Sequence, residues 1–546
     1  MKKIISILVL FMGFSAFAQW TTALSANTVV ANSPTQDIQS VGTSDGQTYV
    51  VYWKNAPAPQ NYELRVQVLN AAGIPQFGPD GMLVSTLIGM STYTVIWSVT
   101  IDANDNLYIG ATGTQDGNAY VFKLDLQGNH LWGTNGIQVG TGNIVKVLPL
   151  SSGEAIVSWY PSGQSLMQKF DASGNALWTS PVPIQLGTSA TIPAGLFELS
   201  NGDYMMVFHR TLFSIYSNLY AQRYNAAGVA QWATPTQIAN SASQFNRTYT
   251  GKTDGESVYY GYFLSGANRF DSYVQRINGD GTLPWGINGV DFDTNQTNYE
   301  MSTEINLDPA AAVVWATCTY MNTGQSMSGE YIQKIDKNTG ARLFTDTAKE
   351  VFPISSDSDV HVGELHLAGG TPFYMLKMGM DTGASPVTLH AVYLNENGDF
   401  VWPEHHLPIA NYGASKSRIG FTKPINGQSV ATFLEQKLND TAPKMYAQNF
   451  VIPTLGIHQP TKELTLQVVN PVKNQLQISA DQVIQQLSVY NLLGVKIAEA
   501  NPAALEITLE ANSWQAGVYF YEIISNKFPT FASYLTETNT NPVNYF

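Results

Sequence analysis

The sequence predicts an all-β fold assembled from repeated units. One pattern recurs: an apolar residue, then Asp or Asn, then glycine, then an aromatic residue four positions after the glycine. An Asx side chain can bond backbone N–H groups just ahead of it, and glycine supplies the positive φ of a tight turn, so each copy predicts a β-hairpin. Neighbouring copies lie 46 residues apart (Asp125 to Asp171) to 59 residues apart (Asp336 to Asn395). A period in this range indicates a propeller or another repeat array.

Seven copies of the hairpin pattern are present, of which Gln168–Trp178 is the clearest and the sixth has an extra turn residue. Their key residues are Asn70, Gly73 and Phe77; Asp125, Gly128 and Trp132; Asp171, Gly174 and Trp178; Asn225, Gly228 and Trp232; Asn278, Gly281 and Trp285; Asp336, Gly340 and Phe344; and Asn395, Gly398 and Trp402. The aromatic residue returns on the second strand of each hairpin, where it can pack on neighbouring side chains.

Two further strand signals separate successive hairpins, so each unit predicts four strands. The candidates for the innermost strand start near Asp37, Thr94, Ile144, Ile192, Phe245, Tyr299, Val360 and Arg418. Eight four-stranded units predict an eight-bladed β-propeller. A seven-bladed ring with one irregular unit is the alternative.

The two ends of the repeat region each hold half of a hairpin. The stretch after Trp20 is similar to the stretch after Trp232, and Tyr446–Phe450 is similar to the outgoing strand that precedes Asn225. We therefore predict a propeller over 19–450 that is closed by its N- and C-terminal strands, because closure leaves no unpaired sheet edge.

These hairpins resemble the D-x-x-G-x-x-x-W repeats of secreted bacterial β-propellers, including the quinoprotein-like group. The resemblance covers roughly 20–450 and implies the fold. Quinoprotein enzymes need dedicated cofactor and calcium ligands, and no part of this sequence matches them. We therefore predict no cofactor and no metal site.

Residues 1–18 predict a secretory signal peptide. Lys2 and Lys3 precede the apolar run Ile4–Phe17, and the small-x-small site ends at Ala18. The run is short for a bilayer span, and no later segment reaches that length. We expect a mature chain that begins at Gln19 and has no membrane span.

Composition changes after Phe450, where 451–462 reads as a linker and 463–546 as a separate β-domain. The motifs Asn470-Pro471-Val472, Leu487–Asn491 with Gly494, and Gly517-Val518-Tyr519-Phe520 resemble the type A C-terminal sorting domain of the type IX secretion system in Bacteroidetes. That resemblance implies a small β-sandwich recognised by the secretion machinery. It also implies export through the periplasm to the outer cell surface or the medium.

Charge and cysteine usage restrict the partners and the chemistry. The net charge is −14 and the pI is about 5.0. This acidity argues against nucleic acid and anionic lipid, because both require basic patches. The one cysteine, Cys318, lies in an apolar run and is predicted to be a buried thiol.

Several short patterns match motifs of catalytic or metal sites, but they predict no catalytic residue. Gly42–Gly46 matches G-x-S-x-G, but it lies between strands instead of opening a helix. Asp102, Asn104 and Asn106 alternate like half of a calcium loop, yet Leu107 replaces the loop glycine, so a turn that bonds its own backbone is favoured.

The histidine pairs also predict no metal site. His405 and His406 are adjacent and His361 and His366 are five apart, so each pair points to opposite faces of a regular strand. Glu364 and His366 share a face and could line a central channel. Tyr259, Tyr260 and Tyr262 could stack on sugars if they were exposed.

The expected function is that of a secreted or cell-surface binding protein for a glycan or a protein; a non-enzymatic role is favoured over catalysis, and a structural component of the cell envelope is a third option. The alternative is a propeller-type polysaccharide-degrading hydrolase or lyase. Asp346-Thr347-Ala348 and Asp440-Thr441-Ala442 resemble the three-residue O-glycosylation signal of Bacteroidetes, which implies modification at Thr347 and Thr441. The ligand-binding residues stay unassigned at this point.

Overall fold

The computed structural model describes residues 20–21, 23–211, 216–244, 249–266, 269–379, 387–438, 440–453, 466–468, 472–493, 495–515, 517–525 and 529–536. All regular elements among these residues are β-strands. They include no helix that is long and apolar enough to cross a membrane. The chain divides into two compact units, 1–452 and 453–546. The signal peptide predicted at 1–18 lies outside the described residues.

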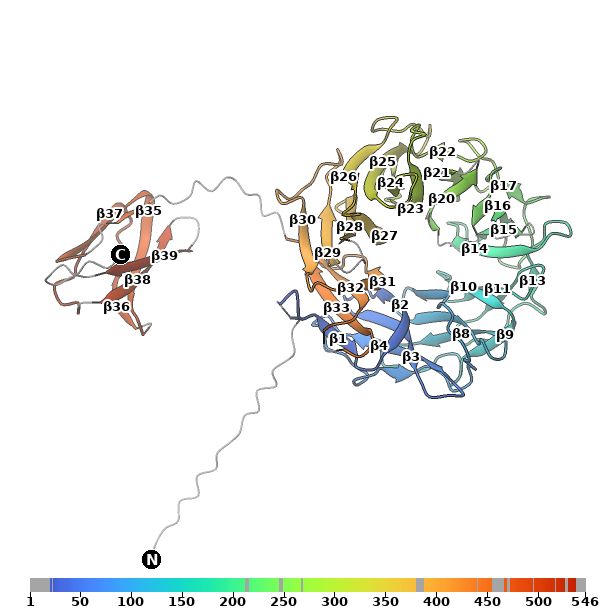
Figure 1. Cartoon of the computed structure of the whole chain (residues 1–546), viewed down its shortest axis with the longest axis horizontal. Coiled ribbons are helices and arrows are strands. Elements are labelled where there is room, and N and C mark those ends of the chain that lie inside the picture. The colour runs from blue at the N-terminus through green and yellow to red at the C-terminus, as the bar shows by residue number, and fades with distance from the viewer. Residues whose placement is uncertain are drawn as a thin grey trace, which may run out of the picture. The chain divides into compact units, whose positions relative to one another are not determined.

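The first unit is an eight-bladed β-propeller: eight antiparallel sheets stand around a central opening (Figure 1). We number the blades in chain order, so that blade 1 starts with β2 and blade 8 with β31. The seven-bladed alternative is therefore wrong. Six of the eight predicted starts of innermost strands fall within two residues of the observed ones, whereas β6 begins at Ser98 and β19 at Thr250.

The strands of the blades have the following bounds. The first strands are β2 (Thr35–Gly42), β6 (Ser98–Ile101), β10 (Asn143–Pro149), β14 (Thr191–Glu198), β19 (Thr250–Asp254), β23 (Tyr299–Leu307), β27 (Val360–Ala368) and β31 (Lys416–Phe421). The second strands are β3 (Thr48–Asn55), β7 (Leu107–Thr112), β11 (Ala155–Tyr160), β15 (Tyr204–Thr211), β20 (Ser257–Gly266), β24 (Val313–Met321), β28 (Thr371–Met378) and β32 (Gln428–Glu435).

The outer strands complete the blades. The third strands are β4 (Tyr62–Leu69), β8 (Asn118–Leu124), β12 (Leu166–Phe170), β16 (Tyr216–Tyr224), β21 (Arg269–Ile277), β25 (Ser328–Asp336), β29 (Thr388–Tyr393) and β33 (Lys444–Val451). The fourth strands are β5 (Met82–Leu83), β9 (Ile137–Thr141), β13 (Val182–Pro183), β17 (Thr236–Gln237), β22 (Val290–Asp291), β26 (Lys349–Ser355), β30 (His406–Ala410) and, for blade 8, β1 (Thr28–Ala31). The short β18 (Ser243–Gln244) also pairs with β16.

The hydrophobic core lies between neighbouring blades. Second strands are covered on both faces, and every residue of β7 is accordingly buried. Between blades 2 and 3, for example, Tyr108 packs in one cluster with Val145 and Trp159. Continuous apolar runs in the sequence thus mark the middle of each blade, because neither face meets water.

The predicted hairpins are present. The Asp171 carboxylate accepts backbone N–H bonds from Ser173 and Asn175, both at 2.8 Å, and Gly174 adopts φ +88°. The aromatic residue then reaches the next blade: Trp132 donates its indole N–H to the carbonyl of Ala172 at 3.1 Å. Each repeat therefore stabilises a contact between blades as well as its own turn.

The first strand of the described chain belongs to the last blade. β1 pairs with β33, with Thr28 opposite Ala447 and Val29 opposite Tyr446. β2 of blade 1 also contacts β31 and β32 of blade 8. N-terminal and C-terminal segments of the unit thus share one sheet, in the same arrangement that a single hairpin gives the other blades.

The second unit contains β34 (Leu466–Val468), β35 (Gln475–Asn491), β36 (Lys496–Ala500), β37 (Ala504–Glu510), β38 (Val518–Ser525) and β39 (Pro529–Thr536). Its strands join into one sheet because the long β35 pairs with β34 and β37 along its first half and with β36 and β38 along its second. Both halves contribute to one core, in which Ile478, Val489 and Ile523 are buried.

Candidate functional site

The two loop-like motifs are structural turns, as predicted. Between β2 and β3, Thr43 donates its N–H to the carbonyl of Gln47, which closes the Gly42–Gly46 turn. The Asp102 carboxylate accepts the backbone N–H groups of Asn104 and Asn106, each at 2.9 Å. Lys123 lies 3.4 Å from the same carboxylate, so the group that resembled a calcium ligand already has a cationic partner.

The histidines of the two sequence pairs contact different partners. His361 contacts the hydroxyl of Thr317 at 2.7 Å, whereas His366 contacts the carbonyl of Phe421 at 2.8 Å. His406 instead approaches His390, with their Nδ1 atoms 3.0 Å apart. This pairing crosses two strands, β29 and β30, and could not be read from spacing along one strand.

Glu364 and His366 do not line the channel together, which corrects the prediction. The register of β27 against β28 shifts between Val362 and His366, where Gly363 adopts φ +79°. His366 is therefore buried, while Glu364 stays exposed. A bulge breaks the two-residue alternation on which the prediction depended.

A small charged group stands on three neighbouring first strands, which face the central opening in Figure 1. We call Thr250, Lys252, Glu304 and Glu364 the channel group. Lys252 lies 3.9 Å from Glu364, and Thr250 donates its hydroxyl to Glu304. Burial, reinforced by the charge of Glu364, raises the pKa of Glu304 to about 7. Glu304 can therefore hold a proton near neutral pH.

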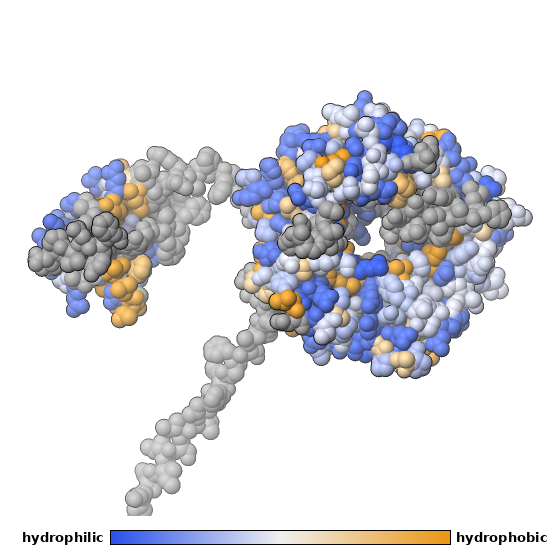
Figure 2. Space-filling model, viewed as in Figure 1, coloured by the Kyte–Doolittle hydropathy of each residue, from blue (hydrophilic) through white to orange (hydrophobic). Residues whose placement is uncertain are grey.

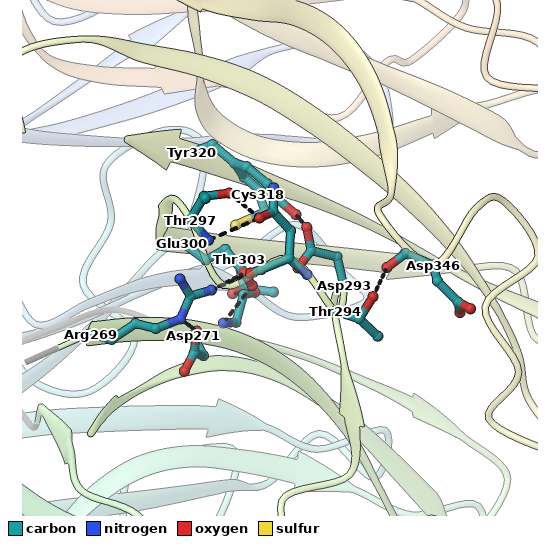
Figure 3. A network of polar contacts seen from close by, with 12 residues as sticks. Arg269, Asp271, Asp293, Thr294, Thr297, Glu300, Thr303, Cys318, Tyr320 and Asp346 are labelled. Carbon is teal, nitrogen blue, oxygen red and sulfur yellow. Dashed lines mark hydrogen bonds and ion pairs between the residues drawn. The ribbon is translucent and has the colours of Figure 1, made fainter. Parts of the chain in front are cut away.

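The strongest acidic cluster lies between blades 5 and 6 (Figure 3). Carboxylate oxygens of Asp291, Asp293 and Glu300 lie within 4.8 Å of one another, which is a spacing suited to a metal ion. Arg269, however, lies 3.3 Å from Glu300, and the Tyr320 hydroxyl donates to Asp293. Two of the three carboxylates, Asp293 and Glu300, thus already have donors within this polar interface between blades.

Burial raises two pKa values in this acidic cluster. The pKa of Asp291 rises to about 7, helped by the neighbouring charges of Asp271 and Asp293. The pKa of Glu300 is raised by its burial and by Asp293. Cys318 lies close by and is buried, as predicted.

A groove opens between blades 2 and 3, with a volume of about 410 Å³. It is formed where the loop before β6, the β7–β8 turn, the start of β10 and the β11–β12 turn meet. Its lining residues are Thr92, Thr94, Trp97, Thr112, Gly113, Thr114, Gly117, Gly142, Asn143, Tyr160, Pro161 and Ser162. The volume lies within the range of about 300–1,000 Å³ that is usual for small-molecule sites. We call it the blade 2–3 groove.

Trp97 is held in a fixed orientation in this groove. Its indole N–H donates to the hydroxyl of Thr112 at 2.9 Å, and its ring packs against the core cluster of blades 2 and 3. Trp97 nevertheless remains partly exposed, unlike the other non-repeat tryptophans of the first unit, Trp53, Trp159 and Trp315, which are buried. Its position outside the hairpin series is shared by those three buried tryptophans, so the sequence alone does not single out Trp97.

A second groove, of about 710 Å³, lies at the join of blades 1 and 8 and is lined by Trp20, Leu24, Phe450 and Val451 among others. Trp20 is the repeat aromatic of blade 8, because its indole N–H bonds the carbonyl of Ala71 at 2.9 Å. The tyrosines Tyr259, Tyr260 and Tyr262 are buried, so they are not available for a ligand.

The remaining residues singled out by the sequence are those of the sorting-domain motifs and the two threonines of the O-glycosylation signals. Gly517 is exposed, and Tyr519 is buried with its hydroxyl bonded to the carbonyl of Gln515, whereas Asn470, Pro471 and Gly494 lie outside the described residues. Thr347 and Thr441 are both exposed, the first in a turn and the second in a bend before β33. O-glycosylation at these two threonines stays a prediction.

Residues 470–532 match the family model of the secretion system C-terminal sorting domain. The protein is therefore exported by the type IX secretion system to the cell surface or the extracellular space. The expected export route is thus confirmed. No curated protein matches the sequence.

Several solved structures are similar at low identity. The polysaccharide lyase Uly1 is 10% identical, with a TM-score of 0.41, over 76% of this chain and 100% of that one. The α-L-arabinanase of Penicillium chrysogenum complexed with arabinobiose is 12% identical, with a TM-score of 0.32, over 56% and 92%. A protein of unknown function from Dyadobacter fermentans is 9% identical, with a TM-score of 0.33, over 57% and 94%.

Proposed function

We propose that this exported propeller is a binding protein that holds a glycan in the blade 2–3 groove. The observation that carries the proposal is the partly exposed Trp97, fixed by Thr112 in a groove that also contains Tyr160. An aromatic face can cover the C–H surface of a sugar ring, while hydroxyl and amide groups around it exchange hydrogen bonds with sugar hydroxyls. Fixing the ring beforehand reduces the entropy lost on binding.

The test is a screen of the mature protein against soluble and insoluble polysaccharides, scored for both retention and product release. We expect retention without product release, and we expect Trp97→Ala to abolish it. Trp232→Ala is the matched control, because Trp232 is a partly exposed tryptophan of another blade. Equal retention by the wild type and the Trp97 variant would reject the groove as the binding site.

A polysaccharide hydrolase is the second candidate, favoured by the channel group. Glycoside hydrolysis commonly uses two carboxylic acids, one of which must hold a proton near neutral pH. Glu304 has that property, and Glu364 is close enough for its charge to raise the pKa of Glu304. In that case the wild type releases reducing ends and Glu304→Gln does not.

A further inference from the structure

We infer that the blade 2–3 groove selects uncharged sugars and rejects uronates and sulfated sugars. This inference rests on the proposed function, since it names the ligand class of the same groove. Its basis is the lining: threonine, serine, asparagine, glycine, proline and two aromatic residues, with no Lys, Arg, His, Asp or Glu among the described residues that form it.

Asp116 is the carboxylate closest in sequence to the lining residues of the groove, and its side chain bonds to its own β7–β8 hairpin. Asp116 lies in the β7–β8 turn between the lining residues Thr114 and Gly117. Its side chain accepts the backbone N–H of Asn118 at 3.0 Å and the hydroxyl of Tyr120. Burial raises the pKa of Tyr120 to about 12, so that hydroxyl keeps its proton and continues to donate. Asp116 thus accepts hydrogen bonds within its own turn, beside the lining residue Gly113, and it offers an anionic sugar only negative charge.

Arg418, a cation beside the loop before β6, is also engaged within the protein. Arg418 of blade 8 lies over the ring of Tyr93, which is flanked by the lining residues Thr92 and Thr94, at 5.6 Å from its centroid. Its guanidinium lies 3.4 Å from the carboxylate of Asp37, and that carboxylate in turn accepts the N–H of Ile96 at 2.8 Å. Arg418 therefore balances a charge within the protein.

An anionic sugar would meet no cation among the described lining residues of this groove. Proteins bind carboxylate and sulfate through charge-assisted bonds from Arg or Lys, and an anion that is desolvated without them is strongly disfavoured. The net charge of −14 adds long-range repulsion. A neutral sugar needs only hydroxyl and amide partners, and the groove supplies these at Thr94, Asn143 and Ser162.

The experiment compares matched probes. Each neutral oligosaccharide retained by the protein is oxidised at C6 to its uronate, and both forms are titrated calorimetrically against wild type, Trp97→Ala and Asn143→Lys. Asn143 is an exposed lining residue, so lysine there adds a cation without altering the core. We expect the wild type to bind the uronate at least about tenfold more weakly and N143K to recover much of that loss.

The outcomes separate the two claims. Uronates or sulfated glycans that bind as tightly as neutral ones, with binding lost in Trp97→Ala, would overturn the selection for uncharged sugars and leave the glycan site intact. Absence of binding to any glycan, neutral or charged, would overturn the proposed function together with this inference. Should Trp97→Ala fail to fold, N143K still decides, because unchanged uronate affinity in that variant contradicts the charge argument.

Discussion

The ring of Trp20 lies directly on Gly73, so that a Cβ added to Gly73 would come within 2.5 Å of Trp20 Cδ2. The same relation joins Trp132 to Gly174, Trp178 to Gly228 and Trp232 to Gly281, each time from one blade to the next. Trp20 thus occupies in blade 8 the place that the hairpin aromatic has in the other blades. Trp20 therefore belongs to blade 8, whose third strand is β33 and whose fourth strand is β1.

Gly73→Ala should destabilise the propeller by more than its backbone conformation alone requires. Alanine at φ +83° costs about 1–3 kcal/mol, and the clash with Trp20 should add about as much again. Gly153→Ala is the matched control, because Gly153 has φ +86° but no atom within 4 Å of an added Cβ. Denaturant unfolding of both variants measures the difference. Equal losses of stability would mean that the Trp20 contact is unimportant.

Removal of residues 19–34 should lower the melting temperature and promote oligomers. The deletion removes Trp20 and β1, which leaves β33 as an unpaired edge that can pair with another chain. Thermal unfolding and light scattering check both effects. A truncated protein that stays monomeric and melts like the wild type would show that β1 is dispensable for the ring.

The fold could be predicted from the sequence because its repeat is local. The Asx residue, the glycine and the aromatic residue lie within eight or nine positions and form one hairpin, so the pattern is visible without knowledge of the partners. A buried glutamine on the third strand recurs in several blades, but the repeat pattern predicted from the sequence does not include it. Gln168 bonds the carbonyl of Trp178, and Gln448 bonds that of Thr21 in the same way across the split hairpin.

His209 should lower the stability of the protein as the pH drops below about 6.5, an effect opposed by Asp291 and Glu304, whose raised pKa values favour the native state on acidification. Its side chain is buried against the Ser243 hydroxyl, and burial, together with nearby Lys146, lowers its pKa to about 3. Between pH 6.5 and 3 the unfolded chain therefore binds a proton that the native state does not. The linkage relation gives a loss of about 2 kcal/mol at pH 5.

His209→Asn removes this titration, so the variant should lose less stability than the wild type between pH 7 and pH 5. Urea unfolding at the two pH values measures the effect. His361 has a similarly low pKa and remains in the variant, which should keep part of the slope. An unchanged slope would assign the acid sensitivity to other groups.

Deletion of 461–546 should leave the propeller folded but retained in the periplasm. The sorting-domain match lies at 470–532, and the propeller is a separate compact unit that ends at Ile452. Cell fractionation locates the truncated protein, and protease resistance of the periplasmic fraction reports its folding. Wild-type amounts at the surface or in the medium would contradict a sorting role for this domain.

The candidate site was beyond sequence reasoning for a geometric reason. Trp97, Thr112 and Tyr160 belong to different strands and loops of two blades, and only the ring brings them together. Glu364 and His366 failed in the opposite way: they are close in sequence, and the bulge at Gly363 separates them. In the space-filling view the first unit is hollowed near its centre (Figure 2). The spacing of residues along the chain does not reveal whether a ligand binds there or in a groove between blades.

The most direct test of glycan binding is a crystal structure with a retained neutral oligosaccharide. The account predicts a sugar ring stacked on Trp97, with its hydroxyls bonded to groups between blades 2 and 3. A sugar bound instead at the central opening, against Glu304 and Glu364, would contradict the groove and favour the hydrolase.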